Sequence, residues 1–574
     1  MIDRLNTWVT KETRSITLAG LLLGVAALAA KIVGLVRDNI LASHYGATAG
    51  DRTLDIYYAG FRVPDLLLNI LILGAVSSAF LPVFTERYAK DREDAWRLTA
   101  NILTLAAAAL AVLAGIFFIL TPYLMPVIAP GFTSEELVRA ENVTRLLLIS
   151  PILFGISSIV SALLHTFKRF VLYSLAPVLY NFGIIIGTLF FTVPEPELAP
   201  AMGAVLGALL HLLIQLPGLK GTGFRFRPIL TPIHEAIREI GALSLPRTAN
   251  LVVNQLQTII LTAIASGAVG AIAIFNLGMN LAFVPVGIFG ISFATAAFPV
   301  LAHAWAEKNR EAFGHALLRT IQEILFFTLP AAVLFLVLRA HIVRVVLGQG
   351  LFSWEDTRLT AAALGAFAVG VVAFALLPLL VRAFFAQKNT TLPLLVAIGS
   401  TTGVTGIAFW LTSALTPGGW WHGALGGLFR VADLPDIRVL ALPIAMSAIS
   451  TLEVLILLLF LRRSLAHGVL ARLLVSTIRL SLASAVAGVV TWAALRPLAE
   501  GVEQETGIGI LLQGTAAGAI GSFVFLLIAA AFAFPEARRI VSFLRRRMPP
   551  LGVILPHESE HMHLPQGEES ERPL

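Results

Sequence analysis

The feature that most constrains this sequence is a series of long apolar runs that recurs along nearly the whole chain. A helix of about 20 apolar residues crosses a hydrocarbon core of ~30 Å. Hydrophobic residues make up 57% of the chain and charged residues only 13%, whereas soluble domains carry about 25% charge. A water-soluble fold cannot bury so much apolar surface. The sequence therefore predicts an all-α polytopic membrane protein.

Fourteen segments have the length and composition of membrane-spanning helices. They cover approximately residues 16–43, 53–84, 97–121, 142–166, 171–193, 199–217, 240–266, 268–302, 320–338, 358–386, 391–413, 439–461, 474–496 and 507–534. The first run is too long for a cleavable signal peptide and lacks a small-residue cleavage site.

The connections between the segments alternate in charge. Basic residues gather in every second connection, as at Lys168 and Lys388, while the others are acidic or mixed, as at Glu135. The positive-inside rule predicts that the basic connections and both termini lie in the cytoplasm of a bacterial cell, with the chain in the inner membrane. The net charge of +7 is then a feature of topology and does not indicate nucleic-acid binding. The chain has no cysteine, which excludes disulfides and cysteine-ligated metals.

The two halves of the chain share a weak internal similarity. Residues 78–83 resemble 295–300, and residues 162–177 resemble 383–393, at an offset of about 220 residues. The similarity predicts two six-helix lobes, although helices rich in Gly, Ala and Pro also look alike by chance. The predicted divisions are a cytoplasmic N-terminal segment 1–15, lobes 16–217 and 240–461, a cytoplasmic linker 218–239, two further helices in 462–534, and a basic then disordered tail 535–574.

Ionisable residues inside the apolar segments are the candidates for function, since each costs about 2.5–3.5 kcal/mol at the centre of a membrane helix. The first two segments hold three cations and three carboxylates, namely Lys31, Arg37, Asp38, Asp55, Arg62 and Asp65. Arginine forks and lysine point charges suit a phosphate group, so these segments predict a cavity for an anionic headgroup. Asp55 and Asp65 also fit an alternative in which they snorkel to the interface.

Other polar residues in the segments have more than one interpretation. Asn181, Gln255 and Asn276 fit interhelical hydrogen bonds first and ligand contacts second. Glu453 lies in the middle of an apolar run, where it could couple transport to H⁺ or Na⁺ or could face a polar neighbour. Pro64, Pro246, Pro285 and Pro378 are predicted to bend their helices.

Several stretches carry a resemblance to a known family. They are Lys31–Asp38 followed by Ala42–Ala47, Asp55–Leu67, Gly74–Pro82, Phe170–Asn181 and Asn276–Pro299. Together they resemble the MurJ/MviN family of lipid II flippases over most of residues 20–400. The resemblance implies a fourteen-helix transporter of the MOP superfamily that performs no bond-making chemistry. Two lobes would surround a cationic cavity and carry lipid II from the inner to the outer leaflet by alternating access.

The resemblance also implies sites and partners. By position, the substrate cavity would include Lys31, Arg37, Asp38, Asp55, Arg62, Asn69 and Asn280. The partners would be lipid II or a related undecaprenyl-linked lipid and the membrane lipids, with no cofactor. The resemblance leaves open Na⁺, H⁺ or the membrane potential as the coupling force, and an association with cell-wall synthesis proteins.

The chain departs from the family at several positions. Leu68, Asn69 and Leu73 stand where members commonly have Arg and then Glu, Asn280 where many have a cavity Arg, and Leu261 where some have a Na⁺-ligating Asp. These differences put a Na⁺ site in doubt and keep open another polyprenyl-linked glycan as substrate.

Three other functions compete with the flippase hypothesis. A multidrug or cation antiporter of the same superfamily would place unpaired carboxylates in its cavity. A membrane glycosyltransferase or phosphatase would need a carboxylate or His constellation, and no such motif is present. The lost Arg and Glu positions would also suit a scaffold that transports nothing.

Overall fold

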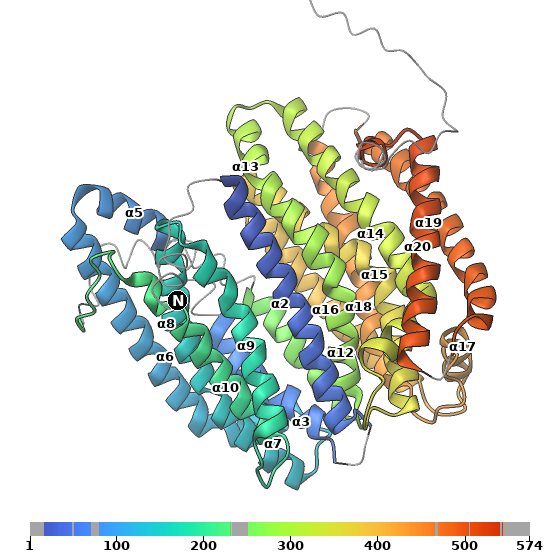
Figure 1. Cartoon of the computed structure of the whole chain (residues 1–574), viewed down its shortest axis with the longest axis horizontal. Coiled ribbons are helices and arrows are strands. Elements are labelled where there is room, and N and C mark those ends of the chain that lie inside the picture. The colour runs from blue at the N-terminus through green and yellow to red at the C-terminus, as the bar shows by residue number, and fades with distance from the viewer. Residues whose placement is uncertain are drawn as a thin grey trace, which may run out of the picture. The chain divides into compact units, whose positions relative to one another are not determined.

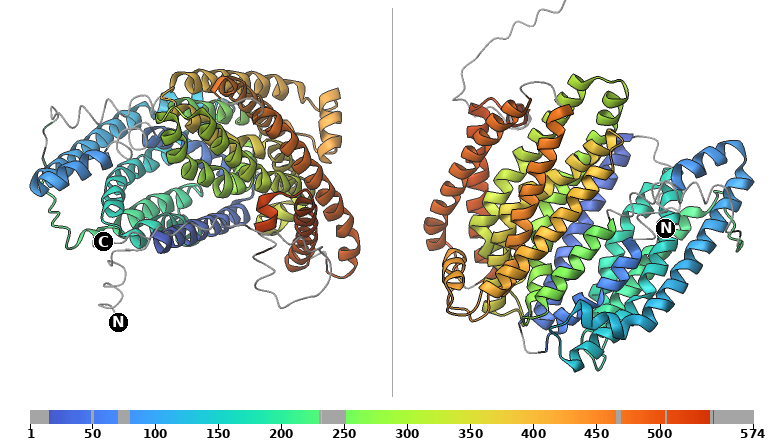
Figure 2. Two further views of the ribbon diagram at one scale, coloured as in Figure 1. Left: turned by 90° about the horizontal axis from the view of Figure 1, so that it is seen from above. Right: turned by 180° about the vertical axis from the view of Figure 1, so that it is seen from behind.

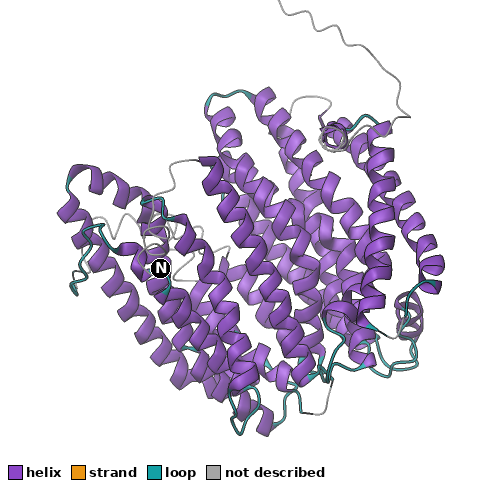
Figure 3. Ribbon diagram, viewed as in Figure 1, coloured by secondary structure: helices purple, strands orange, loops and turns teal. Residues whose placement is uncertain are grey.

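The described part of the chain consists of helices joined by loops, as Figure 3 shows. The computed structural model describes residues 16–48, 51–69, 80–229, 231, 251–464, 469–503, 506–539 and 542. The predictions for residues 1–15, 70–79, 232–250 and most of the tail lie outside the described residues. Helices satisfy every backbone donor and acceptor internally, which a bilayer requires because it offers no water partners.

The helices of the first half pack mainly on one another. They are α2 (Ile16–Tyr45), α3 (Thr53–Gly60), α4 (Arg62–Leu68), α5 (Phe80–Lys90), α6 (Arg92–Ile128), α7 (Ser134–Leu147), α8 (Ile149–Thr166), α9 (Phe170–Phe190) and α10 (Leu198–Leu213), followed by the short η2 (Leu216–Leu219). The largest packing interfaces in this first set join α9 to α10 and α2 to α9.

The helices of the second half form a second set. They are Leu251–Ala265, α12 (Ala271–Pro285), the π-turn η3 (Val286–Ile291), α13 (Ser292–Ala306), α14 (Arg310–Val346), α15 (Trp354–Ala386), α16 (Thr391–Ala414), α17 (Trp420–Phe429), η4 (Arg438–Leu440), α18 (Ala441–Leu461), η5 (Arg462–Ser464), α19 (Val469–Glu500) and α20 (Gly507–Ala531). Here α15 is central, because it packs against α12, α13, α14 and α18.

The chain divides into two units, residues 1–525 and 526–574. Both helix sets belong to the first unit, apart from the end of α20, and Figures 1 and 2 show them from three directions. They meet chiefly where α12 lies against α3 and α2, and where α14 lies against α2. The lobe boundaries given above stay a prediction.

The prediction of a multi-pass helical membrane protein is confirmed. Eleven of the described helices are long and apolar enough to cross a bilayer. Of the other three predicted spans, the first is the 30-residue α2, while the second and seventh run into residues that are not described. The total of fourteen therefore stays a prediction.

The prolines explain some helix breaks. The helical hydrogen-bond ladder is interrupted at Phe61, between α3 and α4, although the backbone there keeps helical angles. Pro64 has no N–H to donate to the carbonyl of Gly60, four residues earlier. The π-turn η3 begins directly after Pro285. By contrast, α15 continues through Pro378 as one helix, and Pro246 lies outside the described residues.

Three helix–helix turns of the basic connections share one geometry. Lys168, Lys308 and Lys388 each have a φ between 54° and 59°. Each turn begins with the lysine N–H bonded to a carbonyl three residues back, and the next N–H reaches one five residues back, as in Asn389 to Phe384 at 3.0 Å. This is a Schellman ending, which stops α8, α13 and α15 and satisfies their last carbonyls.

Glycines bring α9 and α10 into close contact. A Cβ atom on Gly203 would lie 2.9 Å from the Gly187 Cα and 2.7 Å from the Gly183 carbonyl oxygen. Two glycines four residues apart on each helix thus form the interface, the arrangement by which membrane helices approach closely. The association of α9 and α10 depends on this close packing, because helices surrounded by lipid gain no hydrophobic free energy from associating.

We expect Gly203→Leu to destabilise the protein by about 1–3 kcal/mol, because the added side chain has no space between the two backbones. Thermal unfolding in detergent measures the effect. Gly399→Leu on α16 is the matched control, since a Cβ there meets nothing within 4 Å. Equal melting temperatures for the two variants would contradict the close approach of α9 and α10.

Candidate functional site

The N-terminus of α12 is capped by a carboxylate from another helix. Asp55 on α3 is fully buried, and its oxygens accept hydrogen bonds from the Gly270 N–H at 2.8 Å and the Ala273 N–H at 2.9 Å. Gly270 has no side chain that could cap the helix, and its φ of 75° favours a residue without a Cβ atom. The negative charge of Asp55 also suits the positive end of the helix dipole. The snorkelling interpretation is therefore wrong for Asp55.

Arg62 joins α4 to two helices of the second set. It is 5% exposed, its Nε donates to Thr262 Oγ1 at 2.7 Å and its Nη2 donates to Asn276 Oδ1 at 2.9 Å. Both acceptors are neutral side-chain oxygens. The hydrogen-bonding role expected for Asn276 is confirmed.

Arg37 and Asp38 form a buried network that crosses both helix sets. Arg37 donates to Asp38 Oδ1 at 2.6 and 3.0 Å and to Asn181 Oδ1 on α9 at 2.9 Å. On the other side, Asn280 Nδ2 donates to Asp38 Oδ2 at 3.0 Å. The Asp38 side chain is 4% exposed and that of Arg37 is 21% exposed. Asp38 therefore ties α2 to α12, and only Arg37 of the pair has surface left for a ligand.

Lys31 and Asn69 complete the predicted set. Lys31 is exposed, and its Nζ would lie 3.8 Å from a Cβ built on Gly287 in η3. Asn69 donates to Gln255 Oε1 at 3.3 Å and to the Asp65 carbonyl at 2.8 Å. Lys31 is thus the cation of this group that remains most open to a ligand.

The structure brings the predicted residues together along one face of α12 and η3. We call this face the α12 strip, and define it by Gly270, Ala273, Asn276, Asn280 and Gly287. The spacings of three, three, four and seven residues put these positions on one side of a helix. Asp55, Arg62, Asp38 and Lys31 of the first set approach them in that order.

Sequence analysis missed other contacts between the two sets. Asp356, fully buried at the start of α15, accepts from the Ala47 N–H at 3.1 Å and the Thr48 N–H at 2.8 Å. Arg52 donates to the Ser266 carbonyl at 2.9 Å, and Ser266 Oγ accepts from the Gly131 N–H at 2.9 Å. Asp356 stands in a Ser-x-x-Asp capping box, which looks like an ordinary helix start. We call the end of the helices that carries residues 46–48, 51–55, 129–133, 266–273 and 347–356 the junction end.

Glu453 lies away from the α12 strip. It is half-buried on α18, and its Oε2 accepts a hydrogen bond from Ser400 Oγ on α16 at 2.8 Å. The neighbouring Thr401 donates to Gln257 at 3.1 Å. The carboxylate does face a polar neighbour, and a role in ion coupling stays a prediction.

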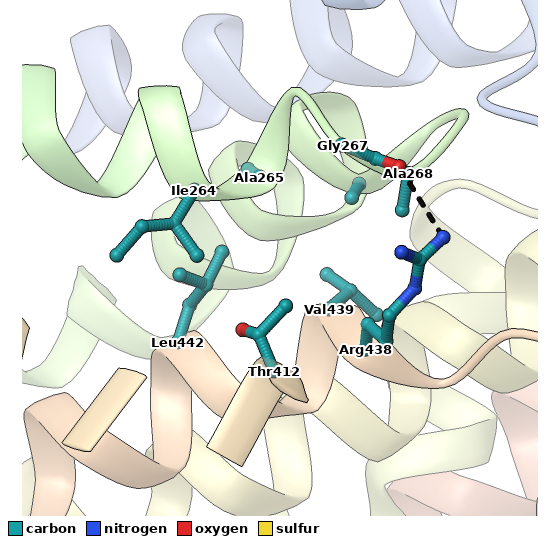
Figure 4. A pocket seen from close by; sticks show the side chains of 9 residues that line it. Ile264, Ala265, Gly267, Ala268, Thr412, Arg438, Val439 and Leu442 are labelled. Carbon is teal, nitrogen blue, oxygen red and sulfur yellow. Dashed lines mark hydrogen bonds between the residues drawn. The ribbon is translucent and has the colours of Figure 1, made fainter. Parts of the chain in front are cut away.

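Two hollows in the described part of the chain are lined by residues outside the α12 strip. Figure 4 shows the smaller, a hollow of about 10 Å³ lined by apolar groups such as Ile264 and Leu442, with Arg438 bonded to the Gly267 carbonyl at 3.2 Å. A space of that size holds about one water molecule. A wider hollow of about 470 Å³ lies beside it, where Arg438 pairs with Asp436.

Among the departures from the family pattern, Leu68 ends α4 and is half-buried, and Leu261 is 1% exposed. Leu73 lies outside the described residues. Asn280 holds Asp38, as described above.

The model of the family described as lipid II flippase MurJ matches residues 41–504. A probable lipid II flippase MurJ of Thermotoga maritima is 30% identical over 396 residues, which are 66% of this chain and 78% of that protein. A probable lipid II flippase MurJ of Rickettsia prowazekii is 26% identical, over 67% of this chain and 75% of its own length.

Solved structures agree in fold. A lipid II flippase MurJ in an inward closed conformation superposes with a TM-score of 0.69 at 21% identity, covering 91% of this chain and all of its own length. An inward-facing multidrug resistance transporter of the MATE family, from the MOP superfamily, superposes with a TM-score of 0.61 at 15% identity, covering 77% of this chain and 97% of its own. The family match extends over most of the sequence and includes the α12 strip, while Arg37 and Asp38 lie just before its first matched residue. This chain belongs to the lipid II flippase MurJ family.

Proposed function

We propose that this chain moves lipid II from the inner to the outer leaflet of a bacterial membrane by alternating access of its two helix sets. Family membership supports the substrate. The observation that carries the mechanism is the α12 strip, where polar groups of the first set bind the second set through directional hydrogen bonds. Such contacts can be exchanged for water or ligand, whereas packed apolar surface resists separation.

The cations have separate tasks in this proposal. Arg62 and the carboxylates Asp38 and Asp55 hold the junction end closed. Lys31 and the exposed part of Arg37 are left to receive the pyrophosphate of the headgroup. The positive-inside prediction turns the junction end to the outside, so these two cations would be reached from the cytoplasmic side.

Rescue of a conditional bacterial strain depleted of its lipid II flippase tests this function. We expect the wild-type chain to restore growth when its presence in the membrane is verified. A well-expressed wild type that gives no rescue would contradict the proposal and would favour another undecaprenyl-linked glycan.

We expect Lys31→Ala to weaken rescue strongly while thermal stability stays within about 0.5 kcal/mol of wild type, because removing an exposed side chain leaves no buried group unpaired. Growth rate in the depleted strain and melting in detergent measure the two effects. Lys308→Ala, which removes a lysine from an exposed turn, is the matched control and should rescue fully. Full rescue by Lys31→Ala would remove this lysine from the headgroup site.

A further inference from the structure

The helix α17 has an entirely apolar exposed face, although it is too short to cross a bilayer. Its exposed residues are Trp420, Gly423, Ala424, Gly427 and Leu428, and Trp420 and Leu428 are 73% and 69% exposed. Its opposite face is anchored by His422, which is 6% exposed and bonds to the Leu434 carbonyl at 3.0 Å. Tryptophan is enriched where membrane meets water. In a chain that spans the membrane, such a face suits the lipid–water interface.

Two arginines lie at the end of this helix. Arg430 follows α17 directly, and its φ of 62° is fixed by the bond from the Val431 N–H to the Gly426 carbonyl at 2.7 Å. Arg339 of α14 packs beside the neighbouring Phe429, since a Cβ built on Gly365 would lie 2.9 Å from Arg339 Cδ and 3.4 Å from Phe429 Cε1. Because Arg430 follows Phe429 directly, the two arginines lie at the same end of α17.

The nearby carboxylates interact with another arginine, Arg358. Arg358 pairs with Asp433 through both guanidinium ends and also donates to the Arg430 carbonyl at 2.8 Å, while Glu355 acts on the same Arg358. The hydrogen bond from Arg358 lowers the pKa of Asp433 to about 2, so this pair stays ionised at neutral pH. In the described part of the chain, no Asp or Glu forms an ion pair with Arg339 or Arg430.

Two like charges held close together without a counter-ion are stabilised by an anion between them. Guanidinium groups bind phosphate oxygens in a planar, two-pronged geometry. We propose that Arg339 and Arg430 bind the phosphate of an anionic phospholipid whose acyl chains lie along the exposed face of α17. This site is separate from the Arg37 region and does not depend on the transported substrate.

The proposal is tested on the purified full-length chain by native mass spectrometry with added phosphatidylglycerol, and with phosphatidylcholine as the zwitterionic comparison. We expect wild type to retain phosphatidylglycerol preferentially. Arg339→Gln and Arg430→Gln should each weaken its binding about tenfold, the loss of one charge-assisted hydrogen-bonding group. Arg496→Gln is the matched control, because this arginine of α19 stacks on Trp492 and should leave binding unchanged.

Two further measurements keep the outcome unambiguous. Melting temperatures of the variants must match wild type, and Arg430→Lys, which keeps the charge without the fork, should bind with intermediate affinity. Equal retention of phosphatidylglycerol by wild type and both glutamine variants would overturn the proposal. Binding of inorganic phosphate as tight as that of the lipid would also overturn it, in favour of a soluble phosphate ligand. Because no lipid II is present, the result is independent of the flippase test.

Discussion

Asp55→Ala is expected to open the junction end of the protein. The substitution leaves the N–H groups of Gly270 and Ala273 without their acceptor in a buried place and removes the negative charge from the start of α12. Unsatisfied buried donors cost about 1–3 kcal/mol each. A loss of about 3 kcal/mol shifts the equilibrium between closed and open junction roughly a hundredfold.

Cysteine labelling measures this shift directly, since the chain has no cysteine of its own. Ala271→Cys places a thiol at a position that is 2% exposed beside the cap. In detergent, a maleimide should react with this thiol far faster when Asp55→Ala is also present. Asp51→Ala is the matched control, because among the described residues this exposed carboxylate hydrogen-bonds within its own turn, to Thr53. Unchanged labelling in the Asp55→Ala background would show that the cap does not hold the junction.

The second large effect is expected for Arg37→Ala, which should both destabilise the protein and abolish rescue of the depleted strain. Removing the guanidinium leaves the buried Asp38 with the Asn280 amide as its remaining side-chain donor in the described part of the chain. Loss of one partner of a buried ion pair costs about 3–5 kcal/mol. Melting in detergent measures this loss, and growth measures function.

A double variant separates the two roles of Arg37. Arg37→Ala with Asp38→Asn removes both charges, so most of the stability should return. Rescue should still fail, because the cation facing the headgroup is absent. If the double variant restores growth, Arg37 serves only to neutralise Asp38, and the headgroup site must be sought at Lys31 or elsewhere.

The helical membrane fold could be predicted from the sequence because the apolar runs and the scarcity of charge leave no other solution. Helix ends and breaks were harder to predict. The break at Phe61 depends on a proline three residues later, while Pro378 interrupts nothing. The short α17 was missed because its ten residues lie between two much longer runs.

The sequence could predict which residues belong to the candidate site, but it could not predict which groups they bind. A charge inside an apolar run is visible in one sequence, so Arg37, Asp38, Asp55 and Arg62 were found. The partners of Asp38, Asp55 and Arg62 in the second helix set lie 200 to 242 residues away, and two of them are backbone N–H groups at the start of α12. Backbone donors carry no residue identity, and therefore no sequence pattern could indicate that Asp55 caps a distant helix.

The lysine turns that end α8, α13 and α15 have a consequence for how this chain is orientated. A left-handed φ favours glycine, so folding stability alone gives lysine no advantage at Lys168, Lys308 or Lys388. An ammonium group beside the negative end of a helix offsets part of that strain. The same three side chains are charges that the positive-inside rule counts. In each turn a single lysine thus both ends a helix and contributes a charge that favours one orientation in the membrane.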